Sequence, residues 1–314
     1  YDRLGPMYKC HIGIRRQDAG CRRHQKHVVK GESLTNLHGF SLREQASFGG
    51  SPFHAPQTGA RANAALAATR DPRHSRAPNT GVPMRVAIVE NTRITHHGQV
   101  GVALHEAAAL IDIWRPWSGQ PLPASPDADA LVVFGGEQSA VDDHTHPYLP
   151  ALAELMAAYT ALDRPVLGIC LGSQLLARAY GGDNHLGVAL EFGWVDVSLT
   201  DAGRADPVLS QVPQTFPIFQ WHSDTFSLPP GAVHLAQSAA AAHQAFRIGR
   251  ATYGTQFHFE ASRSVVRDWS DTFPDTIERM LPGWSTRHPE IAATRGAEAD
   301  SHGLALARAW VGLI

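Results

Sequence analysis

Cys170 lies in a segment whose residue types suit nucleophilic chemistry. Residues 168–174 read Gly-Ile-Cys-Leu-Gly-Ser-Gln; the apolar run before them predicts a strand, and the residues after Cys170 predict a helix. A tight strand-to-helix turn exposes its central side chain at the carboxyl end of a sheet, and flanking glycines relieve crowding there. The helix N-terminus behind the sulfur favours the thiolate. We therefore expect Cys170 to be a nucleophile rather than a small buried core cysteine.

A thiolate nucleophile needs a base, and two of the 18 histidines are candidates. His258 and Glu260 lie two positions apart at the end of an expected strand, Thr255–Phe259, so their side chains would face the same side. Glu260 would then fix the imidazole while the other ring nitrogen faces Cys170. The alternative for this pair is a surface ion pair. His222 has an acidic residue at the same spacing and is a rival base.

Backbone N–H groups near the cysteine are candidates for stabilising an oxyanion. The N–H of Leu171 begins the expected helix, and Gly135 and Gly136 follow the expected strand Ala130–Phe134. The N–H of Gly136 is then a second donor, and a plain turn is the alternative. Residues 142–146, Asp-Asp-His-Thr-His, resemble a metal cluster, but we interpret them as a solvated loop. We predict neither a metal nor a cofactor.

Alternating strands and helices after residue 83 predict a flavodoxin-like α/β fold, a mostly parallel sheet with helices on both faces. In the first half we expect strands at Met84–Val89, Ala109–Trp114, Ala130–Phe134 and Val166–Ile169, and helices at Gln99–Ala109, Pro147–Leu162 and Leu171–Tyr180. Short strands then predict an antiparallel extension, at Val195–Leu199, Ile218–Gln220, Val233–Ala236, Gln244–Ile248 and Thr255–Phe259. Residues 263–273 and 301–313 are expected to be helical.

Composition divides the chain near Met84. Residues 1–83 carry 13 Lys and Arg against 5 Asp and Glu, whereas residues 84–314 carry 14 against 24. The first part keeps no helical or strand period, so we expect it to be a basic, disordered extension. We also expect the natural protein to start at or near Met84, in which case this extension would not belong to it. Residues 84–314 are expected to form one domain. Aromatic residues are not interleaved with the basic ones, which argues against a nucleic-acid partner. The longest apolar runs are too short to predict a membrane span.

Four segments together resemble the class I, triad-type glutamine amidotransferases, in particular the GMP-synthetase type. Residues 168–174 resemble the family's G-x-C-x-G-x-Q elbow. Residues 258–260 resemble its H-P-E segment, with Phe259 in place of proline. Residues 134–139 resemble its G-G-P-x-S oxyanion strand, with Glu137 in place of proline. Residues 221–224, Trp-His-Ser-Asp, resemble the H-G-D segment of its glutamine pocket. The resemblance covers about residues 84–275.

The resemblance implies a stand-alone glutaminase with a Cys170–His258–Glu260 triad. The side-chain amide of glutamine would be hydrolysed through a γ-glutamyl thioester, with the N–H groups of Gly136 and Leu171 holding the oxyanion. The family's pattern argues against His222 as the base. It places six residues around the substrate: Gly135, Gly172, Gln174, His222, Ser223 and Asp224.

Several functional alternatives stay open at this point. The chain shows no phosphate-binding loop or synthetase segment, so ammonia would pass to a separate synthetase or synthase subunit, or to no acceptor. The substrate is expected to be glutamine or a γ-glutamyl compound. A γ-glutamyl peptidase or hydrolase would use the same triad, whereas an inactive glutamine-binding regulatory module would not. A reactive thiolate and the lack of a convincing export signal predict a cytoplasmic location.

Overall fold

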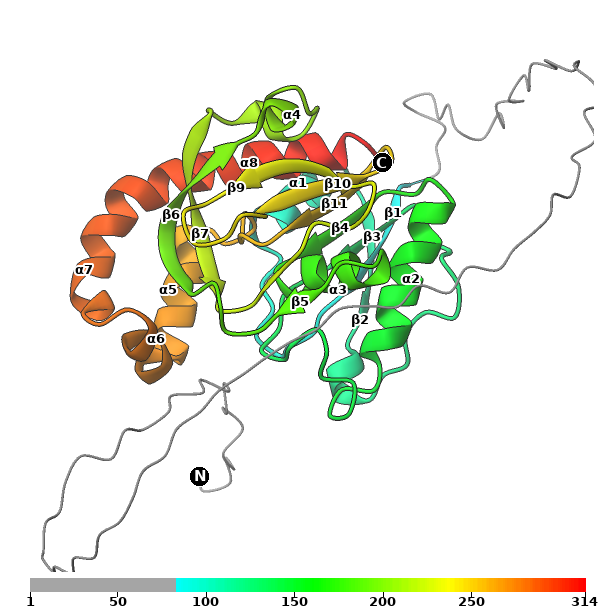
Figure 1. Ribbon diagram of the computed structural model, residues 1–314, viewed down its shortest axis with the longest axis horizontal. Coiled ribbons are helices and arrows are strands. Elements are labelled where there is room, and N and C mark those ends of the chain that lie inside the picture. The colour runs from blue at the N-terminus through cyan, green and yellow to red at the C-terminus, as the bar shows by residue number, and fades with distance from the viewer. Residues whose placement is uncertain (1–82) are drawn as a thin grey trace, which may run out of the picture. The chain divides into compact units, whose positions relative to one another are not determined.

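The computed structural model describes residues 83–314 (Figure 1), so the predictions for residues 1–82 lie outside its range. Its main feature is a nine-stranded sheet in the order β2-β1-β3-β4-β11-β10-β9-β6-β7. The strands of this sheet are β1 (Arg85–Val89), β2 (Leu110–Trp114), β3 (Ala130–Val133), β4 (Val166–Ile169), β6 (Glu191–Leu199), β7 (Thr215–His222), β9 (Val233–Gln237), β10 (Ala245–Ile248) and β11 (Thr252–Thr255). A separate pair joins β5 (Asn184–His185) to β8 (Thr225–Phe226).

The half of the sheet that carries Cys170 is parallel. Strand β1 pairs in parallel with β2 and β3, and β4 lies in parallel between β3 and β11. Side chains alternate along β1, so that Val86 and Ile88 enter one core while Ala87 and Val89 enter the other. This double burial explains why the strands read as continuous apolar runs.

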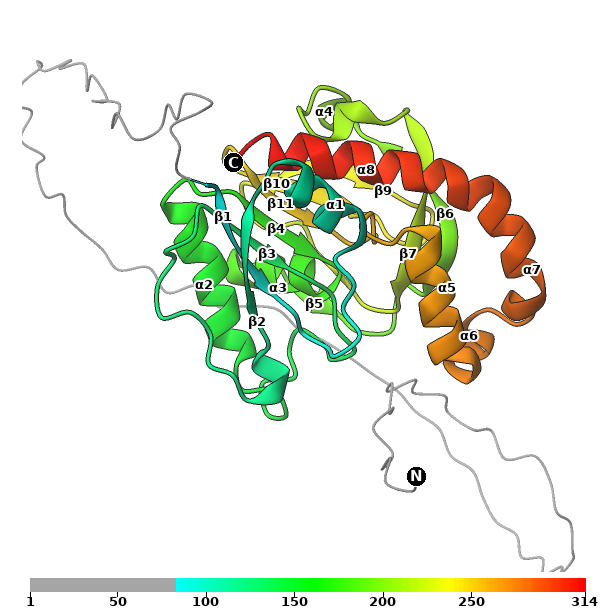
Figure 2. The ribbon, with the colours of Figure 1, turned by 180° about the vertical axis from the view of Figure 1, so that it is seen from behind.

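Helices cover both faces of the parallel half, as Figures 1 and 2 show. Helices α1 (Gly98–Glu106) and α8 (Ala297–Val311) pack on one face and contribute to one core. Helices α2 (Leu149–Ala161) and α3 (Leu171–Ala179) pack on the other. The expected α/β fold with helices on both faces is therefore confirmed.

The other half of the sheet is antiparallel, as expected, but β6 and β7 are longer than the expected strands Val195–Leu199 and Ile218–Gln220. Strands β6 and β7 pair from Glu191 opposite His222 to Ser198 opposite Thr215. The helical elements not yet named are η2 (Pro116–Ser118), α4 (Asp201–Arg204), η3 (Leu209–Gln211), α5 (Arg263–Thr272), α6 (Pro274–Met280), α7 (Trp284–Ile291) and the π-helical turn η4 (Ala292–Gly296). Each helix within residues 83–314 is too short or too polar to traverse a bilayer.

The expected strand Thr255–Phe259 is wrong. The strand in this region, β11, covers Thr252–Thr255, where both β4 and β10 provide partners. Beyond Thr255 the chain leaves the sheet, and its remaining ladder contact is a bridge in which the N–H of His258 donates to the carbonyl of Phe219 at 2.8 Å. The apolar run continues past the strand because Phe257 and Phe259 are buried in the core.

Candidate functional site

Cys170 occupies the turn between β4 and α3, and this prediction is confirmed. Its backbone adopts φ +53° and ψ −109°, a region that costs a residue with a side chain about 1–3 kcal/mol. Hydrogen bonds hold it there: the Cys170 N–H donates to Thr255 O at 2.8 Å, and Cys170 O accepts from the N–H groups of Ser173 and Gln174. The strained turn is thus fixed by the strand beside it and the helix after it.

The two glycines around the cysteine are required by close packing. A Cβ added at Gly172 would lie 2.1 Å from the carbonyl oxygen of Val133, and one added at Gly168 would lie 2.5 Å from Gly172 O. Any larger residue would push α3 away from β3 and β4. Gly168 and Gly172 therefore allow the first turn of α3 to pack closely against β3 and β4.

The sulfur of Cys170 lies in a nearly buried position and faces polar groups. The residue as a whole is 7% exposed. Gln256 Nε2 donates toward the sulfur at 3.7 Å, and the sulfur lies 3.9 Å from the carbonyl oxygen of Trp221. The positive end of α3 begins at Leu171, directly after the cysteine, and favours negative charge on the sulfur.

His258 and Glu260 lie together although they are not on a strand. His258 Nδ1 donates to Glu260 Oε1 at 2.7 Å, and both residues are buried. Burial by itself lowers the pKa of His258, but the charges of Glu260 and Cys170 outweigh it and raise this pKa to about 10. The other ring nitrogen, Nε2, has no hydrogen-bond partner within residues 83–314. This leaves one nitrogen of a charged imidazole available to a substrate.

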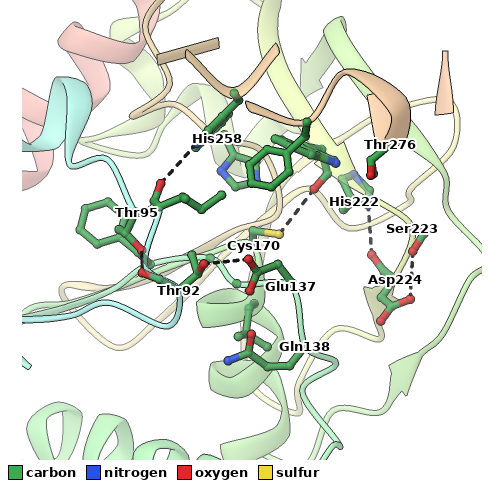
Figure 3. Close-up of a pocket in the computed structure, with 18 of the residues that line it drawn as sticks. Thr92, Thr95, Glu137, Gln138, Cys170, His222, Ser223, Asp224, His258 and Thr276 are labelled. Carbon is green, nitrogen blue, oxygen red and sulfur yellow. Dashed lines mark hydrogen bonds between the residues drawn. The ribbon is translucent and has the colours of Figure 1, made fainter. Parts of the chain in front are cut away.

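Gly135 lies between the histidine and the cysteine. A Cβ at Gly135 would be 3.2 Å from His258 Cε1, 3.4 Å from Cys170 Cβ and 3.9 Å from the Cys170 sulfur. The bare backbone of this glycine thus lets both side chains approach one point. Figure 3 shows Cys170 between His258 on one side and Glu137 and Gln138 on the other.

Two backbone N–H groups are free at this point. Among residues 83–314, the N–H groups of Gly136 and Leu171 donate to no other protein group. The loop that carries Gly136 is held by Asn91, whose Nδ2 donates to Phe134 O at 2.8 Å. A Cβ at Gly136 would lie 3.0 Å from Leu171 Cδ2, so the two donors come from touching segments.

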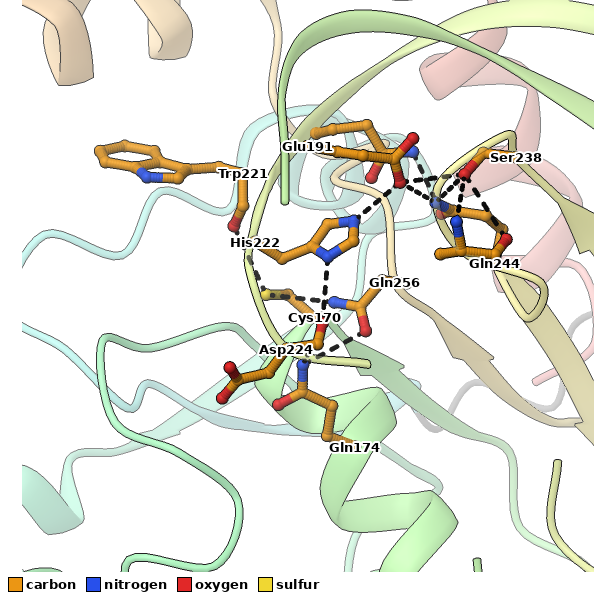
Figure 4. A network of polar contacts seen from close by, with 11 residues as sticks. Cys170, Gln174, Glu191, Trp221, His222, Asp224, Ser238, Gln244 and Gln256 are labelled. Carbon is orange, nitrogen blue, oxygen red and sulfur yellow. Dashed lines mark hydrogen bonds and ion pairs between the residues drawn. The ribbon is translucent and has the colours of Figure 1, made fainter. Parts of the chain in front are cut away.

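His222 belongs to a buried polar network rather than facing the cysteine with a free nitrogen. Its Nδ1 donates to Asp224 O at 3.0 Å, and its Nε2 lies 3.1 Å from Glu191 Oε2 (Figure 4). Glu191 also accepts from Ser238 Oγ at 3.0 Å and Gln244 Nε2 at 2.6 Å. Because both ring nitrogens are occupied, the geometry favours His258 over His222 as the base for Cys170.

Three other predicted substrate residues, Gln174, Ser223 and Asp224, are hydrogen-bonded together beside this network. Gln174 Nε2 donates to Asp224 O at 3.3 Å and to Gln256 Oε1 at 3.2 Å. The carboxylate of Asp224 accepts from the Gly187 N–H at 2.8 Å and from Ser223 Oγ at 3.3 Å. Carboxylate and hydroxyl oxygens are therefore held at one edge of the cavity.

These groups line a single cavity of about 240 Å³. Of the predicted site residues, the cavity wall holds Gly135, Gly136, Cys170, Leu171, Gln174, His222, Ser223, Asp224, His258 and Glu260. Gly172 does not line the cavity, because it packs on β3 behind the cysteine. The wall also includes residues that the sequence analysis did not select, among them Thr92, Glu137, Trp269 and Phe273. The sequence analysis also did not select Gln256, which donates toward the Cys170 sulfur. Its position two residues before a candidate base was a signal in the sequence that could have identified it.

The loop that resembled a metal cluster contains an ion pair. Asp143 accepts two hydrogen bonds of 2.6 Å from the guanidinium of Arg178, which holds the pKa of Asp143 below its usual range. Asp142 accepts from the N–H of Ser139 at 2.9 Å. Within residues 83–314, no group of three or more His, Cys, Asp or Glu side chains is arranged to hold a metal ion.

Comparison with known proteins places this site in a family. The profile of the glutamine amidotransferase class-I family matches residues 111–268, just over half of the chain. The glutamine amidotransferase-like protein YfeJ of Salmonella typhimurium is 35% identical over 156 residues, which are 48% of this chain and 65% of YfeJ. One subunit of the glutamine-hydrolysing GMP synthase of Methanoregula boonei is 30% identical over 176 residues, covering 55% of this chain and 89% of that protein.

Two solved structures share the fold at similar identity. A glutamine amidotransferase of Thermotoga maritima is 25% identical with a TM-score of 0.65, covering 73% of this chain and 97% of that one. A glutamine amidotransferase of Methylobacillus flagellatus is 28% identical with a TM-score of 0.65, covering 74% and 95%. From the matched profile, these relatives and the shared fold, we conclude that the chain belongs to the class I glutamine amidotransferase family.

Proposed function

We propose that this protein hydrolyses the side-chain amide of glutamine through a γ-glutamyl thioester on Cys170. The observation that carries the proposal is the meeting of three features in one cavity: the strained cysteine at the start of α3, the paired His258 and Glu260, and the free N–H groups of Gly136 and Leu171. A nucleophile, a base with an orienting carboxylate and two oxyanion donors are the parts that acyl transfer needs.

The first half of the reaction forms the thioester. The sulfur of Cys170 attacks the amide carbon, and the negative charge that develops on the oxygen is stabilised by the N–H groups of Gly136 and Leu171. His258, held as an imidazolium by Glu260, gives its proton to the departing nitrogen. Ammonia leaves as the carbon–nitrogen bond breaks.

The second half releases glutamate. His258 is now neutral, so it accepts a proton from water while the water oxygen attacks the thioester carbon. The carbon–sulfur bond breaks and the thiolate returns. Gln174, Ser223 and Asp224 are suited to hold the amino-acid end of glutamine, because their amide, hydroxyl and carboxylate groups lie together at one edge of the cavity.

The ammonia acceptor is proposed to be a separate synthetase or synthase subunit. Support comes from the relatives, several of which are one subunit of a GMP synthase. A thiolate nucleophile needs reducing surroundings, which supports a cytoplasmic location. No acceptor chemistry is assigned to this chain itself.

Release of glutamate from glutamine by the purified full chain tests the proposal. Replacing Cys170 with serine is expected to lower the rate on the order of 10⁴-fold or more, because the nucleophile is lost. The matched control is Cys21→Ser, which removes a thiol elsewhere in the sequence and should keep the wild-type rate. Equal activity of the Cys170→Ser variant and the wild type would contradict the proposal.

A further inference from the structure

The cavity has an apolar side that free glutamine does not need. Its wall near α5 and α6 is built from Trp221, Trp269, Phe273 and Met280, with Ile94 beside Trp269. The rings form one surface: the Trp221 and Trp269 centroids are 5.4 Å apart, and those of Trp221 and Phe273 are 5.8 Å apart. The indole N–H of Trp269 donates to Ile94 O at 3.4 Å, which fixes the ring.

This aromatic surface adjoins His258, the residue that protonates the leaving nitrogen in the proposed mechanism. The ring of Trp269 stands edge-on to His258 at a centroid distance of 5.6 Å. In the proposed mechanism His258 gives its proton to the leaving nitrogen, so any substituent on that nitrogen extends from His258 toward Trp269. In the same mechanism the amino-acid end of the substrate is held elsewhere, by Gln174 and Asp224, which are hydrogen-bonded to each other. Ammonia carries no substituent that could contact these rings.

An exposed cation also lines the cavity. Arg279 on α6 lines the cavity and is exposed, and its Nη2 donates to Thr276 Oγ1 at 3.0 Å. It forms no ion pair with a residue in the range 83–314 that the structure describes. An exposed arginine on the wall of a partly apolar cavity matches a carboxylate that follows an apolar body.

We propose that Cys170 also cleaves γ-glutamyl amino acids whose leaving amino acid has a large apolar side chain. The apolar side chain packs on Trp221, Trp269 and Phe273, and the leaving carboxylate pairs with Arg279. This inference rests on the proposed thioester mechanism at the same site. It adds a substrate class that fills the apolar side of the cavity.

The chemistry balances without a further reactant. The sulfur of Cys170 bonds to the γ-glutamyl carbonyl carbon, and the electron pair of the broken carbon–nitrogen bond stays on nitrogen. That nitrogen takes the proton of His258 and leaves as the free amine of the amino acid. Water then supplies the oxygen of the new carboxyl group and returns a proton to His258, so one water is consumed for each amide bond cleaved.

A panel of four substrates tests the inference on the full chain. We would measure kcat/KM for glutamine, γ-glutamylglycine, γ-glutamylphenylalanine and γ-glutamyl-2-phenylethylamide, which lacks the terminal carboxylate. We expect γ-glutamylphenylalanine to exceed both glutamine and γ-glutamylglycine by about tenfold or more, because its ring is buried on the aromatic wall. Its kcat/KM should exceed that of the phenylethylamide by about fivefold, because one exposed ion pair, between the leaving carboxylate and Arg279, contributes about that much.

Two arginine variants examine the carboxylate contact without disturbing the core. In Arg279→Gln the advantage of γ-glutamylphenylalanine over the phenylethylamide should disappear. The matched control, Arg267→Gln, removes an exposed arginine on α5 that does not line the cavity, and it should leave the ratio unchanged. An unchanged ratio in Arg279→Gln would overturn the assigned carboxylate partner.

The outcomes separate this inference from the proposed function. If glutamine is cleaved by a Cys170-dependent reaction but γ-glutamylphenylalanine is no better than γ-glutamylglycine, the aromatic wall does not select the leaving group and this inference falls alone. If none of the four substrates yields glutamate, the proposed function fails and the inference falls with it.

Discussion

The backbone of Cys170 and the charge on His258 are the residue-level features on which the proposed chemistry depends. The positive φ of Cys170 is held by Thr255, Ser173 and Gln174, so the strained conformation presents the sulfur to the cavity. The sequence was informative here, because glycines around a cysteine at a strand-to-helix turn have a steric cause. It was less informative about the histidine, since two His residues had an acidic neighbour at the same spacing.

The choice between the two histidines depends on contacts that a sequence does not contain. His222 is tied on both nitrogens, by Asp224 and by Glu191, a residue 31 positions earlier. His258 keeps one nitrogen without a partner among residues 83–314. The pairing of His258 with Glu260 was predicted from an expected strand, and the pair forms in the structure on a turn instead.

Replacing Glu260 with glutamine should change how activity depends on pH. The proton on His258 is needed by the leaving nitrogen, and its raised pKa keeps that proton in place well above pH 6.5. Without the negative charge of Glu260, burial dominates and the pKa of His258 falls. The alkaline limb of kcat/KM should therefore move to lower pH, with a loss on the order of 10²-fold or more at pH 8.

A pH profile of glutamate release from about pH 5 to about pH 11 measures this shift, because it brackets both the ordinary pKa of histidine and the raised pKa of His258. The matched control is Glu106→Gln, which removes an exposed carboxylate paired with Arg308 at the end of α1 and should leave the profile unchanged. An alkaline limb in Glu260→Gln at the wild-type position would show that Glu260 does not set the protonation of His258.

At the scale of elements, the parallel half of the sheet was the most predictable. Strands buried on both faces read as short apolar runs, and the expected strand Val166–Ile169 agrees with β4 at both ends. The antiparallel half was less predictable because the ends of its strands depend on their partners. The helices α6 and α7 were missed altogether, since Pro274, Pro289 and Gly283 interrupt the helical pattern there.

The buried network around Glu191 joins elements that are far apart in the sequence. Glu191 begins β6, His222 ends β7, Ser238 follows β9 and Gln244 precedes β10. One carboxylate thus accepts hydrogen bonds from three side chains in the interior. Sequence patterns do not predict this network, because its members lie on separate elements and share no common motif.

Replacing Glu191 with alanine should cost about 3 kcal/mol of the free energy of unfolding, because the buried His222 and Gln244 and the half-buried Ser238 lose their acceptor. Urea denaturation measures the loss. Glu106→Ala is the matched control: its ion pair with Arg308 is exposed on both sides, so removing it should cost much less. Equal losses in the two variants would mean that the Glu191 network adds no more than a surface contact.

For the whole molecule, the division near Met84 is still a proposal. We propose that residues 84–314 fold as one domain without the first 83. In support, the first strand of the sheet, β1, begins at Arg85 and lies between β2 and β3. The net charge of −2 for the whole chain hides the difference between a basic first part and an acidic remainder.

Truncation gives a direct measurement of this proposal. A chain of residues 84–314 should keep the thermal midpoint of the full chain within about 2 °C and retain its glutaminase activity. A chain that starts at Asn91 is the control, because it lacks β1 and should fail to fold. Loss of folding in the 84–314 chain would show that the first 83 residues contribute to the domain.

The proposed function depends on a covalent bond between Cys170 and the γ-glutamyl group. Mixing the full chain with glutamine, quenching with acid within one turnover and measuring the intact mass tests for that bond. We predict a mass increase of one γ-glutamyl group, located on the peptide that contains Cys170 and absent from Cys170→Ser. Glutamate release by the wild type with no such adduct at any quench time, or with the adduct on another residue, would contradict the account.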